Sequence, residues 1–74
     1  MVQLRAVLDD LVGLLGPDHP DTLWTRHSLG VVLGQAGRNE EAVAQLRAVL
    51  EDRLRLLGHD HPHTLMTRKA LASL

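Results

Sequence analysis

The sequence contains no cysteine, phenylalanine or tyrosine, and Trp24 is its only large aromatic residue. The absence of cysteine excludes disulfide bonds and thiolate metal sites, which are the usual staples of small domains. The lack of aromatic side chains beside abundant Leu, Val and Ala favours helices over sheets. A chain of 74 residues therefore has to be stabilised by the packing of helices around a small core.

Long apolar runs and blocks of one charge are also missing. The formal net charge is -1, from 8 basic and 9 acidic residues, and neither sign forms a run that could follow a phosphate backbone. Apolar stretches such as Val31 to Leu33 are far shorter than the roughly 20 residues of a membrane helix, and no signal peptide follows Met1. We therefore expect a soluble, cytoplasmic chain that binds neither nucleic acid nor membrane.

The clearest positive feature is an internal repeat with a period of 42 residues. Residues 1–32 align with residues 43–74 without a gap, and 18 of the 32 aligned pairs are identical. Within this alignment, Asp18-His19-Pro20 recurs as Asp60-His61-Pro62. Self-similarity at a fixed period of this length is typical of repeat architectures. The whole chain, 1–74, is therefore predicted to form one repeat domain.

Each repeat unit is predicted to contain two helices. From Glu40 to Leu57, apolar residues recur at the three- and four-residue spacing of one buried helical face. Asn39 is the expected cap of this helix, and Gly58 is expected to end it in a left-handed conformation. The preceding helix is framed by Pro20 and Gly37, and its Gly30 would let a neighbouring helix approach closely. The predicted helices span residues 2–15, 20–36, 39–57 and 62–74.

The period and the packing positions resemble the tetratricopeptide repeat, in the 42-residue variety found in kinesin light chains and many bacterial repeat proteins. The residues that carry the resemblance are Leu29-Gly30, Leu33, Gly37, Ala42, Leu46 and Val49, with the linker from Leu57 to Pro62. The resemblance implies an all-α fold, in which antiparallel helical hairpins stack as a right-handed α-solenoid. The first helix of each hairpin would line a concave groove that binds a peptide, with Trp24, His27, Ser28, Val31, Gln35, Met66, Lys69 and Ser73 facing it.

Three groove positions depart from patterns known in the family. Val31 stands where the carboxylate-clamp pattern has a ligand-binding asparagine, and His27 stands where that pattern has a basic residue. Ser28 replaces an asparagine that is common in the kinesin light chain version. Neither the capture of a C-terminal carboxylate nor the cargo of kinesin light chains is therefore expected.

Trp24 has two interpretations. Its indole could cover the seam between neighbouring helices as part of the core. Alternatively, near an open groove, it could be a large rigid anchor of the kind that dominates peptide and protein interfaces. Met66 is its repeat copy, so the two would form an apolar stripe, and such a stripe could also be a surface for self-association.

No enzymatic activity and no cofactor are predicted. Ser28 and Ser73 are the only serines, and the sequence has neither a nucleophile elbow nor a phosphate-binding glycine-rich loop. The adjacent carboxylates of Asp9-Asp10 and Glu40-Glu41 diverge by about 100 degrees on a helix and do not face each other.

One linker contains a candidate metal site. His59, His61 and His63 alternate there, and neutral imidazoles can hold zinc or nickel. However, His61 is the repeat copy of His19, and both precede a proline at a helix start. Packing on the linker or capping of the helix is the alternative role for these two side chains.

The first and last helices are expected to expose apolar faces. The first would be a wall helix without its groove-lining partner, and the last a groove-lining helix without its wall. Because repeat arrays normally need about three units for stability, we expect a homo-oligomer, most simply a dimer. Stacking of the last helix on the first helix of another copy would give a ring or a filament, whereas a domain-swapped or two-fold dimer would be closed. The expected self-association residues are Leu4, Leu8, Leu11, Leu15, Leu65, Leu71 and Leu74.

Two functions are therefore open from the sequence. The first is a non-catalytic protein-protein interaction scaffold that binds a peptide or protein segment in the concave groove. The second is a structural, self-assembling repeat fragment, natural or engineered, whose main partner is another copy of itself.

Overall fold

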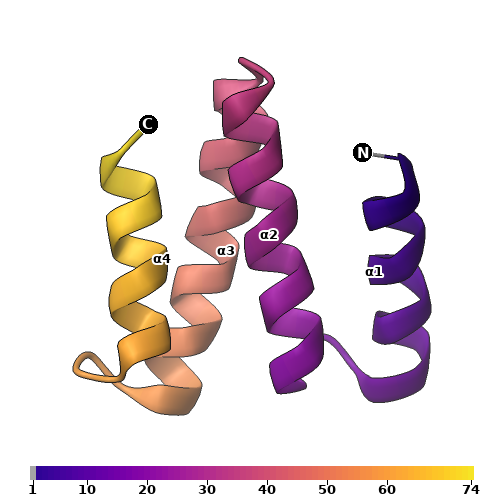
Figure 1. Ribbon diagram of the computed structural model, residues 1–74. Coiled ribbons are helices and arrows are strands. Elements are labelled where there is room, and N and C mark those ends of the chain that lie inside the picture. The colour runs from indigo at the N-terminus through magenta and orange to yellow at the C-terminus, as the bar shows by residue number, and fades with distance from the viewer. Residues whose placement is uncertain (1) are drawn as a thin grey trace.

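The computed structural model describes residues 2–74, and the side chains from Leu4 onward. Its elements are α1 (Val2–Leu15), α2 (Pro20–Gln35), α3 (Asn39–Leu57) and α4 (Pro62–Ala72), without a strand in this part of the chain. Each helix runs antiparallel to the one before it, and the loops between them are short (Figure 1). The predicted all-α architecture of helical hairpins is confirmed.

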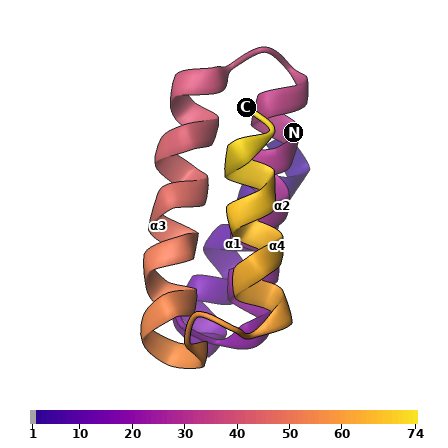
Figure 2. The same ribbon diagram turned by 90° about the vertical axis from the view of Figure 1, so that its left-hand side faces the viewer.

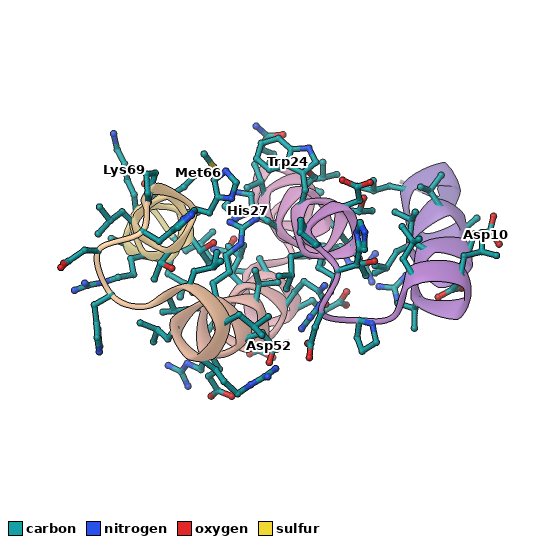
Figure 3. The ribbon with its side chains drawn as sticks, turned by 90° about the horizontal axis from the view of Figure 1, so that it is seen from below. Asp10, Trp24, His27, Asp52, Met66 and Lys69 are labelled. Atoms are coloured by element: carbon teal, nitrogen blue, oxygen red, sulfur yellow. The ribbon has the colours of Figure 1, made fainter. Side chains whose placement is uncertain are left out.

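The helices form two layers rather than a flat row. Seen from the side, α3 lies apart from α2 and α4, which overlap (Figure 2). Seen from below, α2 and α4 lie toward one face of the molecule and α3 toward the opposite face (Figure 3). The face formed by α2 and α4 is therefore the one on which a groove was predicted.

Glycines end the first three helices. Gly16, Gly37 and Gly58 have φ angles of 88°, 79° and 87°, the left-handed region in which a side chain would be strained. At the end of α2, the amide of Gly37 donates to the carbonyl of Gly34 and that of Arg38 donates to the carbonyl of Leu33. These bonds satisfy carbonyl groups that the helix itself leaves free.

Two helices are shorter than predicted. α2 ends one residue earlier, because Ala36 has a ψ of 2° and the next residue, Gly37, turns into the left-handed region. α4 ends two residues earlier, where the amide of Ser73 is shared between the carbonyls of Lys69 and Ala70. A last turn tightened in this way is common at helix ends.

The starts of α2 and α4 are capped differently from the start of α3. His19 and His61 precede α2 and α4, and the Nδ1 of each accepts the amide hydrogen two residues later, at 3.1 Å in both cases. The capping role suggested for these two residues is therefore the observed one. Asn39, predicted as the cap, is instead the first residue of α3, and Arg38 at the N-cap position makes no side-chain capping bond. The Arg38 to Glu41 ion pair of 2.7 Å lies at this helix start instead.

The core lies between α2 and α3. Its buried apolar residues are Leu23, Leu29, Leu33, Ala42, Leu46 and Val49. Gly30 lets the two helices come together, because a Cβ atom added there would lie 2.6 Å from Cγ of Leu46. This confirms the close approach predicted at Gly30.

The first helix lies on the outside of this core. Leu4 and Leu8 of α1 are partly buried and pack against the cluster of Leu29, Leu33 and Ala42. α1 therefore extends the core across α2, on the side opposite to α4 (Figure 1).

Candidate functional site

The candidate site is the face shared by α2 and α4. Trp24, Met66 and Lys69 lie along the same edge of the molecule, and Asp52 of α3 lies at the opposite edge (Figure 3). The structure thus brings predicted groove residues from both repeat units onto one surface.

Trp24 is the largest feature of this surface. Its side chain leaves the residue 51% exposed, so it is not part of the core. Met66, its repeat copy, is 40% exposed. Two large apolar side chains are therefore open to solvent on the same face.

His27 is placed differently from the other groove residues. It is only 6% exposed, and its Nδ1 forms a hydrogen bond of 3.1 Å with the hydroxyl of Thr67 on α4. Its ring stacks on the indole of Trp24, with a centroid distance of 5.8 Å and an angle of 14° between the planes. His27 therefore offers little surface to a peptide, but it fixes the position of Trp24.

Arg53 of α3 joins His27 and Thr67 in a hydrogen-bond network. It is 1% exposed, and its Nη1 donates to the hydroxyl of Thr67 at 2.8 Å and to the carbonyl of His63 at 3.0 Å. Neither Arg53 nor Thr67 was predicted from the sequence as part of a site. A signal was present, because Arg53 is aligned with the apolar Leu11 in the 42-residue repeat. Arg53 also follows Leu46 and Val49 at the three- and four-residue spacing of the buried face of this helix, which indicates a buried polar group.

The pKa values of His27 and Arg53 are both lowered in this network. Burial lowers the pKa of His27, and the nearby charge of Arg53 and the His63 side chain lower it further. Burial also lowers the pKa of Arg53, assisted by the charge of Arg26. His27 is therefore held neutral near neutral pH, as required for a ring that lies close to a buried cation.

A hollow adjoins the C-terminal halves of α2 and α4. Its volume is about 360 Å³, and three predicted groove residues, Val31, Gln35 and Ser73, line it. The remaining lining residues are Gly34, Leu46, Ala70 and Leu74. Ser28 is half-buried, whereas Gln35, Lys69 and Ser73 are exposed. The surface thus combines the exposed side chains of Trp24 and Met66 with a hollow of mixed polarity.

The opposite edge carries the shortest ion pair between two helices among residues 4–74. Arg26 of α2 donates to Oδ2 of Asp52 on α3 at 2.7 Å, and both side chains are largely buried. Arg55 reaches the other oxygen of Asp52 at 3.3 Å. Burial alone would raise the pKa of Asp52, but the hydrogen bonds from Arg26 and Arg55 outweigh it and hold this pKa below its ordinary value. The pair fixes the register of α3 on α2.

The predicted self-association residues fall into two groups. Leu4, Leu8, Leu11 and Leu71 are half-buried within the chain. Leu15, Leu65 and Leu74 are exposed, by 41%, 48% and 42%. Val7 and Leu14, which were not predicted, are also exposed on α1.

The histidine-rich linker was the one candidate metal site. The rings of His61 and His63 lie edge to face, with their centroids 5.0 Å apart, while Nδ1 of His61 is engaged by the amide of His63. From residue 2 onward, no three His, Asp or Glu side chains are grouped in a way that could hold a metal ion. In the same part of the chain, every helix is too short or too polar to cross a bilayer.

Stacked antiparallel hairpins with a sequence period define an α-helical repeat protein. A family model described as tetratricopeptide repeat matches residues 22–63, which is one full period of the repeat. The chain belongs to the tetratricopeptide repeat family, and its 42-residue period is consistent with the kinesin-light-chain-like variety. No curated protein and no solved structure gives a significant match. Members of this family are generally non-catalytic domains for protein-protein interaction.

Proposed function

We propose that the chain binds a peptide or protein segment on the face formed by α2 and α4, with Trp24 as the anchor. The observation that carries the proposal is the exposure of the indole in a rigid setting. Because the ring stacks on buried His27, and His27 is held by Thr67, Trp24 is fixed before a ligand arrives. A rigid aromatic anchor loses little conformational entropy on binding.

The charges on this face suggest which segment fits. The eight predicted groove residues include one formally charged side chain, the exposed Lys69, and no carboxylate. A segment with a large apolar side chain for the stripe of Trp24 and Met66, and an acidic side chain for Lys69, would be complementary. The exposed ammonium group contributes mainly to specificity and association rate.

The single tryptophan gives a direct readout. An array of synthetic dodecapeptides, each with one large apolar and one acidic residue at varied spacing, is probed with the labelled chain and then titrated by tryptophan fluorescence. Peptides that bind should shift the indole emission to the blue as water leaves the ring. Trp24→Ala should lose peptide capture on the array while the helical circular dichroism signal is kept.

Arg47→Ala is the matched control, because Arg47 is exposed on α3, outside the predicted groove. It should capture the same peptides as the unchanged chain. If Trp24→Ala binds the peptides as well as Arg47→Ala does, the groove is not the binding site.

Self-association is the second candidate function, as a homo-oligomer whose smallest form is a dimer. Repeat positions that are buried in the middle of the chain are exposed in its outer helices. Val49 is 0% exposed and its copy Val7 is 48% exposed, while Leu23 is 3% exposed and its copy Leu65 is 48% exposed. The apolar area left open in this way favours association with another copy. Light scattering over a concentration series tests it, and a constant mass of one chain would exclude it.

A further inference from the structure

The contact between α2 and α3 provides a pattern for contact between copies. By the 42-residue repeat, α4 is the copy of α2 and α1 is the copy of the C-terminal three quarters of α3. Hence α4 of one chain and α1 of another carry the side chains of a pair that already packs within each chain.

We propose that α1 of a second copy packs on α4 in the position that α3 occupies on α2, and that Arg68 and Asp10 then form an intermolecular ion pair. This inference rests on the self-association candidate above and adds its register. The pair is the repeat copy of Arg26 and Asp52, which lie 2.7 Å apart. Arg26 recurs as Arg68 and Asp52 as Asp10.

The two charges are available for this contact. Arg68 and Asp10 are both exposed, and among residues 4–74 neither takes part in an ion pair. Asp10 lies on the side of α1 that faces away from the rest of the molecule (Figure 3). The same free side of α1 carries the exposed apolar Val7, and α4 carries the exposed Leu65. Each helix therefore offers one charged and one apolar side chain to the contact, and the charges on α4 and α1 are opposite.

A second copy of this chain fits better than an arbitrary apolar partner, because the ion pair sets a register that only a repeat-like helix can meet. Each contact uses α4 of one chain and α1 of the next, so every dimer still offers one free α1 and one free α4. The contact is heterologous, and association should continue beyond the dimer with rising concentration.

One position differs from the pattern in a way that can be used experimentally. Gly30 gives α2 its close approach to Leu46, but the copy of Gly30 is Ala72 and the copy of Leu46 is Leu4. Within the chain, a Cβ atom added at Gly30 would lie 2.6 Å from Cγ of Leu46. The Leu4 side chain of the second copy must therefore rotate to admit Ala72. Ala72→Gly should remove this obstacle and strengthen the association a few-fold.

Charge reversal tests the register in the 74-residue chain. Sedimentation velocity and light scattering at low salt are recorded for Arg68→Asp, for Asp10→Arg and for their equimolar mixture. Each variant alone places like charges together and should associate about tenfold more weakly than the unchanged chain. In the mixture, contacts between the two variants restore opposite charges, so the mass should rise again. Arg47→Asp and Glu51→Arg, which make the same charge changes at exposed positions of α3, should associate like the unchanged chain.

Circular dichroism of each variant verifies that the helices are kept, and the recovery in the mixture does not depend on the stability of either variant relative to the unchanged chain. An unchanged chain that stays monomeric would overturn this inference and the self-association candidate together. If the chain associates, but the reversals behave like their controls and the mixture shows no recovery, the register is wrong while self-association stands.

Discussion

The guanidinium of Arg53 donates a hydrogen bond of 2.8 Å to the hydroxyl of Thr67, and no carboxylate among the described residues pairs with this buried cation. The Nε of Arg53 is also buried without a hydrogen-bond partner. The neutral oxygens of Thr67 and His63 are therefore its only compensation. This contact joins α3 to α4 and, through His27, reaches Trp24 on the candidate binding face.

Replacement of Arg53 should separate its packing role from its charge. Arg53→Ala should lower the free energy of unfolding by about 2–4 kcal/mol, because it leaves a cavity and removes two hydrogen bonds. Arg53→Met keeps much of the volume without a charge to desolvate, and should stay within about 1 kcal/mol of the unchanged chain. Urea denaturation followed by circular dichroism measures both. Equal losses for Ala and Met would show that the polar guanidinium with its hydrogen bonds, and not the volume of the side chain, is required.

Two glycines within helices should respond with opposite signs to substitution by alanine. Gly30→Ala forces a Cβ atom to within 2.6 Å of Cγ of Leu46, a leucine that is 1% exposed and has little room to move. We expect a loss of about 1–3 kcal/mol from overpacking.

Gly13→Ala is the matched substitution in α1, where nothing lies within 4 Å of the added Cβ atom. Alanine should there gain about 0.5–1 kcal/mol through its better helix propensity. Thermal unfolding of the two variants side by side measures the difference. A stabilising effect of Gly30→Ala would mean that α2 and α3 are not in close contact at this turn.

The stability of the chain should fall in mildly acidic solution because of His27. The pKa of His27 is lower in the folded chain than its ordinary value of 6.5, so the unfolded chain takes up a proton first as the pH falls. Stability is therefore complete above about pH 6.5 and is lost as the pH falls from there through the lowered pKa of the folded state. The midpoint of urea denaturation should be lower at pH 5.5 than at pH 7.5.

His27→Asn keeps a polar group near Thr67 without a titrating ring, and should flatten this part of the pH profile. His59→Asn at the exposed linker position is the control and should leave the profile unchanged. If His27→Asn retains the loss between pH 7.5 and pH 5.5, another group is responsible.

A second loss of stability is expected below pH 3.8, because Asp52 has a lowered pKa in the folded chain and its pairing with Arg26 is lost on protonation.

The sequence alone was sufficient for the fold class and for the number and order of the helices, although α2 and α4 end earlier than predicted. The 42-residue period, the apolar spacing from Ala42 to Leu57, and the glycine at position 58 are local signals, and they predict helices and their ends without knowledge of tertiary contacts. Close approach at Gly30 was also predictable, because a glycine within a helix commonly marks a position where another element comes near.

Only the tertiary structure decided which polar side chains are buried and which apolar ones are exposed. His27 and Trp24 are three residues apart on one helix, yet His27 is 6% exposed and Trp24 is 51% exposed. That difference depends on which neighbouring side chains cover each residue, because His27 is hydrogen-bonded to Thr67 of α4 and Thr67 is hydrogen-bonded to Arg53 of α3. Periodicity determines which residues share a helix face, whereas burial depends on the neighbouring helix that covers that face.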